Sequence, residues 1–175
     1  MNLMLEARTV LESARYCTLA STTSADTFYF EDDNLIGSVT EYPGVSQLLD
    51  AWERTQDAFL GQHARQLRAH PAKSWNVYTI HLTSESAAAE FASRLFAVEE
   101  DFRGTRKVAR AGIRTKEDLR RALLPLLPIQ NLVALTRADQ TERLRARLVD
   151  CHSSLEHLLG DLPIPEMANR ILEAQ

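Results

Sequence analysis

The sequence is poor in cysteine, in long apolar runs and in any large excess of one charge. Its 175 residues include two cysteines, and the formal net charge is −4 at pH 7. Cys17 and Cys151 match no metal-ligand spacing, which favours free thiols in a reducing compartment. No segment approaches the roughly 20 apolar residues of a membrane helix, and the charged N-terminal residues do not resemble a signal peptide. We therefore expect a cytoplasmic protein without a membrane contact.

The sequence also lacks the patterns that accompany common chemistries. It has no G-x-S-x-G turn, no glycine-rich phosphate loop and no histidine pair at zinc-binding spacing. The acidic run at residues 31–33 has no lysine nearby, because none precedes Lys73, so the Asp…Glu-x-Lys pattern of magnesium-dependent nucleases is missing. We predict no catalytic residues, no metal ligands and no cofactor, and therefore a protein that is not an enzyme.

Apolar periodicity predicts alternating strands and helices. Residues repeat at three- and four-residue steps in the expected helices and at two-residue steps in the expected strands. Helices are expected over residues 3–14, 48–67, 88–95 and 115–124, and strands over residues 16–20, 27–30, 35–42, 75–82 and 108–113. Thr83 and Ser84 are candidate N-caps of the third helix, and Thr115 with Asp118 forms a capping-box pattern for the fourth.

These elements predict an α+β fold. The strand at residues 75–82 carries apolar groups on both sides, which indicates an interior strand covered on both faces. The strands at 27–30 and 35–42 flank a short polar turn, as in an antiparallel hairpin. We expect one domain over residues 1–131, with an antiparallel or mixed sheet of about five strands packed by helices. Residues 132–175 are expected to form a helical C-terminal extension.

Two leucine-rich stretches are candidate contacts for a partner chain. Leu126 and Leu127 lie between two prolines in a rigid, apolar connector. Leu144, Leu148 and Leu155 follow the alternating four- and three-residue steps of a helical seam, which lasts only about two heptads. Such a short seam is unstable alone in water. Both stretches are therefore expected either to pack within the chain or to bind a partner.

A basic series is the third candidate contact. Eight cations fall within the nineteen residues from 103 to 121, and they are Arg103, Arg106, Lys107, Arg110, Arg114, Lys116, Arg120 and Arg121. On one face they would bind an acidic partner subunit or the phosphate backbone of DNA. The alternative without a binding role is a solvated face whose arginines pair with Glu99, Glu100 and Asp101.

Several segments, in this order, resemble a known family. They are FYFEDDNLIGSV, LLDAWERTQDAFL, KSWNVYTIHLT, VEEDFRGTRKVAR and LLPLLPIQN, which together extend over residues 27–131. They resemble the small middle component of bacterial ABC three-component conflict systems, to which the Lamassu anti-phage systems belong. The resemblance depends on spacing and residue character, because no catalytic signature is shared.

The resemblance implies a non-enzymatic adaptor between an SMC-like ABC ATPase and an effector subunit, commonly a nuclease. Arg103, Arg106, Lys107 and Arg110, together with the leucines named above, are then the expected partner-binding residues. Two alternatives come from other classes of protein. One is a small magnesium-dependent nuclease that uses Glu31, Asp32 and Asp101 with Lys107, and the other is a free-standing DNA-binding regulator.

Overall fold

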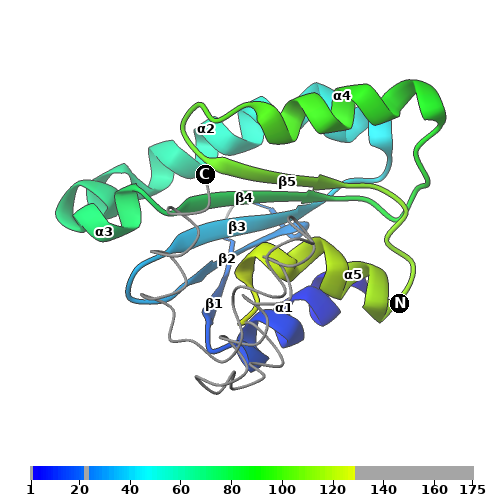
Figure 1. Cartoon of the computed structure of the whole chain (residues 1–175). Coiled ribbons are helices and arrows are strands. Elements are labelled where there is room, and N and C mark those ends of the chain that lie inside the picture. Colours follow the sequence, from blue (N-terminus) through cyan, green and yellow to red (C-terminus); the bar gives the residue numbers. More distant parts are fainter. Residues whose placement is uncertain (1, 22–23, 129–175) are drawn as a thin grey trace, which may run out of the picture. The chain divides into compact units, whose positions relative to one another are not determined.

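The computed structural model of the chain describes residues 2–21 and 24–128 (Figure 1). The chain divides into two units, Met1–Pro128 and Ile129–Gln175, and the described residues belong to the first. The expected helical extension over residues 132–175 lies outside the described residues. The same is true of Leu144, Leu148 and Leu155, so the seam stays a prediction.

A five-stranded mixed sheet forms the centre of the first unit and confirms the predicted α+β fold. Its strands are β1 (Cys17–Ala20), β2 (Thr27–Glu31), β3 (Ile36–Glu41), β4 (Val77–Leu82) and β5 (Arg106–Arg110), and they lie in sequence order across the sheet. The pairs β1–β2 and β2–β3 are antiparallel, whereas β3–β4 and β4–β5 are parallel. The expected hairpin and the interior position of β4 are both confirmed.

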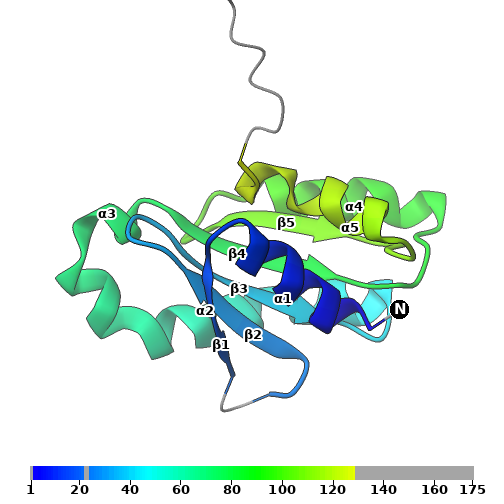
Figure 2. The same cartoon turned by 90° about the horizontal axis from the view of Figure 1, so that it is seen from below.

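Helices cover both faces of this sheet. They are α1 (Leu3–Ser13), α2 (Val45–Ala69), α3 (Pro71–Ser74), α4 (Ala89–Glu100) and α5 (Lys116–Leu123), followed by the 3₁₀ turn η1 (Leu124–Leu126). Parallel neighbours need a crossover connection, and α2 and α4 supply the two crossovers on one face. Helices α1 and α5 lie on the opposite face, and Figure 2 shows α1 in front of the strands.

The N-termini of the helices show which of the predicted capping residues form hydrogen bonds. The Thr115–Asp118 capping box is confirmed, since each side chain accepts a hydrogen bond from the other residue's backbone N–H. Helix α2 begins after Gly44, which has no capping side chain. A distant carboxylate supplies the cap instead, because Glu85 Oε2 accepts from the Val45 N–H at 2.6 Å.

Two local predictions are wrong. Thr83 and Ser84 do not cap α4, which begins after Ala88 without a side-chain cap; Thr83 is buried and accepts from the Glu85 N–H at 3.2 Å. Trp75 is not in β4, which begins at Val77, and it instead ends the short helix α3 with 82 % of its surface exposed. At Thr83 the tertiary pairing of the strand end overrides the local propensity, because its N–H donates to the Arg110 carbonyl at 3.0 Å.

The strand β5 also begins earlier than expected, at Arg106 and not at residue 108. Its backbone pairs with β4 from Tyr78↔Arg106 to Leu82↔Arg110. Both terminal arginines are exposed, so their charge does not interrupt the pairing of the backbone. Alternation along β5 places residues 107 and 109 on the opposite face of the sheet from 106, 108 and 110.

The face under α1 and α5 is apolar. Its buried residues include Phe28, Phe30, Val39, Ile80, Leu82, Val108, Leu119 and Leu123. Phe30 lies directly opposite Gly37 in the β2–β3 register, and a Cβ at residue 37 would meet the Phe30 ring at 2.4 Å. Glycine at position 37 therefore makes room for a large aromatic side chain on the neighbouring strand.

Candidate functional site

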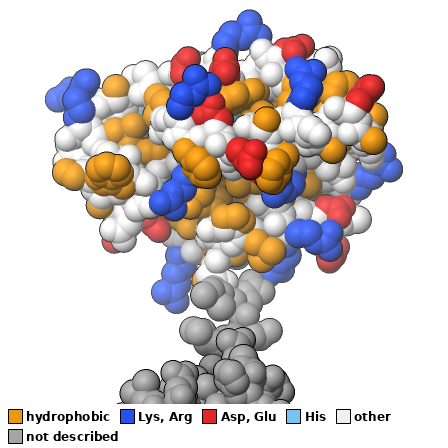
Figure 3. All heavy atoms as spheres, turned by 45° about the horizontal axis from the view of Figure 1, so that its top comes forward, with side chains coloured by type: hydrophobic (Ala, Val, Ile, Leu, Met, Phe, Trp, Pro, Cys, Tyr) orange, Lys and Arg blue, Asp and Glu red, His pale blue; other side chains and the backbone are white. Residues whose placement is uncertain are grey.

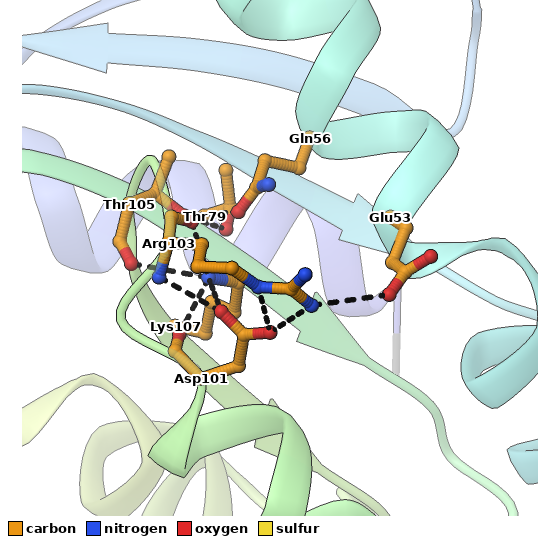
Figure 4. Close-up of polar contacts among 7 residues, drawn as sticks. All are labelled: Glu53, Gln56, Thr79, Asp101, Arg103, Thr105 and Lys107. Atoms are coloured by element: carbon orange, nitrogen blue, oxygen red, sulfur yellow. Dashed lines mark hydrogen bonds and ion pairs between the residues drawn. The ribbon is translucent and has the colours of Figure 1, made fainter.

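The face of the sheet under α2 carries a row of polar side chains, although the strands there are buried. Ser38 and Thr40 come from β3, Thr79 and His81 from β4, and Lys107 from β5, and all five residues are buried. Burial of a polar group is unfavourable unless the group is hydrogen-bonded. The partners of each side chain therefore decide what this polar layer can do, and Figure 4 shows its most highly charged part.

Lys107 is the most unusual member of the layer, because its side chain is 0 % exposed. Its ammonium donates to the carbonyl oxygens of Asp101 at 2.5 Å, Arg103 at 2.9 Å and Thr105 at 3.2 Å (Figure 4). It also lies 5.3 Å from the centre of the Trp52 ring on α2. Burial lowers the pKa of Lys107, and the nearby carboxylate of Asp101 opposes that shift. The buried ammonium of Lys107 thus holds the loop at residues 101–105 in place through hydrogen bonds to its backbone.

The outer side of the same loop carries an ion pair. Arg103 donates to Asp101 Oδ2 through Nη2 at 2.6 Å and through Nε at 2.9 Å, and its Nη2 lies 3.7 Å from Glu53 Oε1 on α2 (Figure 4). The hydrogen bonds from Arg103 hold the pKa of the Asp101 carboxyl well below its usual range. Asp101 therefore lies between a buried cation and an exposed one.

A chain of hydroxyl and amide groups joins the loop to α2. Thr105 Oγ1 lies 2.8 Å from Gln56 Oε1 and 2.9 Å from Thr79 Oγ1 on β4. The loop reaches this position through Gly104, whose φ of +76° lies in the left-handed region that favours glycine. A Cβ at that residue would also approach the Leu60 side chain to 3.0 Å.

His81 sits at the other end of the layer in a second hydrogen-bonded chain. Its Nδ1 lies 2.9 Å from the Tyr42 hydroxyl, which donates to Thr55 Oγ1 at 3.0 Å; Thr55 in turn donates to the Ala51 carbonyl at 3.1 Å. With Tyr42 donating to Thr55, His81 Nδ1 is the donor to Tyr42. Burial, and then the charge of Lys107, lower the pKa of His81 to about 3, and burial raises the pKa of Tyr42 to about 12. Both groups are neutral at physiological pH.

These contacts give the polar layer a structural role. A general base must reach the proton that it removes, but His81 is fully buried and Lys107 has its donors directed at backbone carbonyls. The layer instead fixes the position of α2 and of the loop at residues 101–105 on the sheet. Its hydrogen bonds are directional, so they determine which side chains the loop presents to solvent.

The basic series does not form one exposed face. Side chains alternate between the two faces along β5, so Lys107 points into the protein. Its predicted place on a partner-binding surface is thereby corrected. Arg103 is 82 % exposed in its side chain. Arg106 is exposed and donates to the Tyr78 hydroxyl at 3.1 Å, with its guanidinium 5.7 Å from the centre of that ring. Arg103 and Arg106 therefore contact different parts of the protein, Glu53 on α2 and Tyr78 on β4.

Arg110 has a local role at the edge of the sheet. It forms an ion pair with Glu99 on α4. The same carboxylate accepts a hydrogen bond from the Ala109 N–H at 2.9 Å, which occupies a backbone donor on the outer edge of β5. Glu99 therefore blocks part of this edge against pairing with another strand. The expected pairing of local arginines with the acidic run is confirmed for Asp101–Arg103 and for Glu99–Arg110.

The two leucines of the connector pack into the apolar face. Leu126 is buried in the core cluster under α1 and α5, and Leu127 is half-buried against it. The Tyr16 hydroxyl donates to the Leu126 carbonyl at 2.9 Å, which fixes η1 against the start of β1. Of the two alternatives left open for Leu126, packing within the chain is the one observed. Leu124, one turn earlier, is the exposed leucine of this segment.

The residues of the nuclease alternative are engaged in separate contacts. Glu31 accepts from Lys73 at 2.7 Å and from Gln66 at 2.6 Å. Burial alone would raise its pKa, but the hydrogen bonds from Lys73 and Gln66 and the nearby positive charge together lower it. Asp32 accepts from two backbone N–H groups of its own turn at 2.8 Å. Asp101 and Lys107 lie in the polar layer. Within residues 2–21 and 24–128, no group of three histidine, cysteine or acidic side chains is arranged to hold a metal ion.

Exposed aromatic side chains were missed by the sequence analysis. Phe96 on α4 is 60 % exposed and Phe102 in the following loop is 77 % exposed. Figure 3 shows hydrophobic side chains gathered between charged side chains of both signs on the side of the molecule that carries α2 and α4. The signal was present in the sequence, because residues 92, 93, 96 and 97 of α4 are small or apolar at helical spacing and face away from the buried Leu95 and Val98.

Comparison with known proteins gives no relative. No protein-family model, no curated protein and no solved structure matches the chain. None of the described helices is long and apolar enough to cross a membrane.

Proposed function

We propose that this protein is a non-enzymatic adaptor of a bacterial anti-phage defence complex, in which it links an SMC-like ABC ATPase to an effector subunit, a nuclease. The proposal combines the resemblance of residues 27–131 with one structural observation. The loop at residues 101–105 is fastened from inside by Lys107 and presents Phe102 and Arg103 to solvent. The loop belongs to the segment VEEDFRGTRKVAR, on which the resemblance partly depends.

The composition of the exposed part of this loop supports a protein contact. Aromatic and arginine side chains are enriched among the residues that dominate binding energies at protein interfaces. Phe102 is 77 % exposed and the Arg103 side chain is 82 % exposed, next to one another in the chain. An exposed phenylalanine is unfavourable in water, and burial under a partner removes that penalty.

The rigidity of the loop supports the same conclusion. Binding is weakened when loops and side chains must be ordered as the complex forms. Asp101 holds the Arg103 guanidinium by two hydrogen bonds, and Glu53 lies 3.7 Å away on α2. The loop is thus ordered before any partner arrives, which suits a subunit that has to hold two larger proteins in a fixed arrangement.

The first experiment co-expresses the protein with the products of its neighbouring genes and purifies the assembly through a tag on this chain. The double variant F96S/F102S is expected to lose at least one co-purifying subunit, because it removes both exposed aromatics of the α4 side. Trp75→Ser is the matched control, since it replaces a side chain that is 82 % exposed on α3. Assembly that survives F96S/F102S, or that only the Trp75 variant abolishes, would contradict the proposed contact.

The second experiment separates the adaptor from the two alternatives. Purified protein is incubated with plasmid DNA and Mg²⁺ and is also titrated with duplex DNA at several salt concentrations. An adaptor leaves the plasmid intact and shows no salt-dependent binding by the isolated chain. Cleavage that Asp101→Ala abolishes would identify a nuclease, and salt-sensitive binding that Arg106→Ala weakens would identify a DNA-binding regulator.

A further inference from the structure

The two edge strands of the sheet, β1 and β5, lie at its opposite ends (Figure 1) and differ in how far their backbones are already bonded. At the β5 edge, the Ala109 N–H donates to Glu99 Oε1 at 2.9 Å and the Ala109 carbonyl accepts from Arg110 at 3.1 Å. The exposed Arg106 and Arg110 would also repel the same arginines of a second copy. The β5 edge is therefore protected against pairing with another strand.

The β1 edge is open. Asp26 and Asp32, one at each end of β2, are bonded to the β3 side through their backbones at 2.9 and 3.0 Å, so the even-numbered residues of β2 bond to β3. Its odd-numbered residues therefore bond to the odd-numbered residues of β1. Thr18 and Ala20 then direct their N–H and C=O groups away from β2. Within residues 2–21 and 24–128, no group forms a hydrogen bond with the backbone of either residue.

The side chains of β1 are compatible with a second copy of this chain. None of the four residues is charged, so two β1 strands can pair without repulsion. Exposed edges are commonly protected by charged residues or proline, and β1 contains neither. Leu19 is 47 % exposed, which leaves an apolar side chain for a neighbouring strand to cover.

The unpaired backbone groups favour one register between two copies. In an antiparallel pair, residues of a bonded pair exchange both of their hydrogen bonds. Thr18 of each copy can therefore bond to Ala20 of the other, which uses all four outward groups of each strand. A register centred on Thr18 would instead place Ala20 opposite Tyr16, whose N–H already donates to the Leu11 carbonyl at 3.1 Å.

This register places Leu19 of both copies on the two-fold axis. Leu19 lies between the two bonded pairs, so it faces its own counterpart as a non-bonded pair, with Cα atoms about 4.5 Å apart. Side chains of such a pair lie on the same face of the sheet and close together. The two exposed leucines would therefore cover one another.

Charges on α1 fit the same register. Glu12 accepts a hydrogen bond from the Thr18 side chain at 2.5 Å. The Arg8 guanidinium lies 5.3 Å from the centre of the Phe28 ring, and Phe28 is opposite Ala20 in the sheet. Because Thr18 of one copy faces Ala20 of the other, Glu12 of each copy is level with Arg8 of its counterpart. Opposite charges are thus brought to the same height along the paired strands.

We propose that two copies of this chain associate through their β1 edges as a symmetric dimer, in which the two five-stranded sheets continue as one. The interface is isologous, since the same strand contributes on both sides of the two-fold axis. The proposal goes beyond the adaptor role and does not depend on it, because β1 lies at the opposite end of the sheet from β5 and the loop at residues 101–105.

The first test is sedimentation velocity of the full chain from low micromolar to several hundred micromolar concentration. The wild type is expected to pass from monomer to dimer. Leu19→Lys should raise the dimer Kd at least tenfold, because two ammonium groups would meet at the axis. Phe96→Lys, at a position of α4 that is 60 % exposed, is the matched control and should dimerise as the wild type does. A wild type that stays monomeric, or a dimer that only Phe96→Lys disrupts, would overturn the proposal.

The second test removes one backbone donor. Ala20→Pro deletes an N–H that points outward, so the bonds between β1 and β2 stay intact while the proposed contact loses a hydrogen bond. We expect at least a tenfold weaker dimer with a Tm close to that of the wild type. Ala20→Ser keeps the N–H and is the control. Equal dimerisation of Ala20→Pro and Ala20→Ser, with both variants folded, would contradict pairing through the backbone.

The third test fixes the register by disulfide formation. Leu19→Cys, in a chain that also carries Cys17→Ser and Cys151→Ser, is expected to form a dimer on a non-reducing gel, because a Cα separation of about 4.5 Å suits a disulfide. The control keeps Cys17 as its single cysteine. In the proposed register the two Cys17 residues lie roughly 13 Å apart along the strands, too far for a disulfide. Cross-linking through Cys17 and not through position 19 would overturn the proposal.

The same variants distinguish a second copy from a strand of another protein. The wild type and Leu19→Lys are each co-expressed with the products of the neighbouring genes. A wild type that is monomeric when purified alone, together with loss of a co-purifying subunit in Leu19→Lys, would assign the β1 edge to that subunit and overturn the dimer. Loss of a subunit only in F96S/F102S would leave the dimer standing while it supports the separate adaptor contact.

Discussion

The face of the sheet under α1 and α5 is built from apolar side chains such as Phe30 and Ile80. The face under α2 combines apolar clusters with the buried polar side chains of Thr79, His81 and Lys107. The same strands supply both faces, because neighbouring residues of a strand point in opposite directions. On the apolar face, stabilisation comes from surface removed from water, which does not depend on direction. On the polar face the apolar clusters contribute in the same way, but the buried polar side chains also need hydrogen bonds, which require particular distances and angles.

The two faces therefore contribute differently to the stability of the molecule and to the shape of its surface. The apolar face can tolerate small shifts of α1 and α5 as long as packing is kept. The polar face fixes α2 and the loop at residues 101–105, since the three carbonyls around Lys107 converge on one ammonium. The proposed interaction feature, the loop with Phe102, is on the polar side of the sheet.

The largest expected effect is on the apolar face. Phe30→Ala removes a side chain that is 0 % exposed, and we expect the free energy of unfolding to fall by about 3–5 kcal/mol through lost burial and the cavity left behind. Urea denaturation followed by circular dichroism measures it. Leu19→Ala, at an exposed position of β1, is the control and should change stability by less than about 1 kcal/mol. Equal losses would show that the apolar face does not dominate stability.

The next largest effect is expected at Lys107. Lys107→Met keeps the length of the side chain but leaves three buried or part-buried carbonyl oxygens without their shared donor. We expect a loss of about 3 kcal/mol in the free energy of unfolding, measured by urea denaturation. Lys116→Met, which removes an exposed ammonium 3.0 Å from Glu6, should cost less than about 1 kcal/mol. If Lys107→Met proves as stable as the wild type, the ammonium does not hold the loop.

His81 makes the polar face sensitive to mild acid. Its pKa is about 3 in the folded protein and about 6.5 in the unfolded chain, so the unfolded state binds more protons between those values and stability falls as the pH is lowered. From pH 6.5 to pH 5 the expected loss is about 2 kcal/mol. Urea denaturation at several pH values measures it.

The variant His81→Asn keeps a donor for Tyr42 and removes the titration, so its stability should change little over the same range. Carboxylates with a lowered pKa, such as Asp101, contribute at lower pH, because their stabilisation is lost only below about pH 4. A wild type and a His81→Asn variant with the same pH dependence between 6.5 and 5 would contradict the buried, neutral state of His81.

The smallest effect is expected at the exposed end of β5. Arg106→Ala removes a hydrogen bond of 3.1 Å to the Tyr78 hydroxyl and a contact with its ring. Because the guanidinium is exposed, we expect a loss of about 0.5 kcal/mol, measured by urea denaturation at low and high salt. A loss as large as that of Lys107→Met would mean that the two faces depend equally on directional contacts.

Much of the fold could be predicted from the sequence. The periodic apolar residues of α1 and α2, the hairpin of β2 and β3, and the Thr115–Asp118 capping box depend on nearby residues, and all were confirmed. The errors arose where distant residues decide. Thr83 was expected to cap a helix but is buried, and its N–H donates to the Arg110 carbonyl. The start of α2 is capped by Glu85, forty residues away in the chain.

The candidate site was harder to predict because charge alone does not reveal burial. Arg103, Arg106, Lys107 and Arg110 form one basic series in the sequence, yet the structure separates them into an exposed loop cation, an exposed strand end, a buried ammonium and the partner of Glu99. Alternation along β5 would have separated Lys107 from its neighbours if the strand had been predicted to begin at Arg106.

The class of fold follows from local sequence patterns, since the two- and four-residue periodicities and the helix caps operate over a few residues of chain. Which polar residues are buried, and which groups they bind, depends on contacts between residues that are distant in the chain. Packing α2 over β3 and β4 brings together Gln56, Thr79 and Thr105, which are far apart in the chain, and in the low-polarity interior each of them requires a partner of defined position.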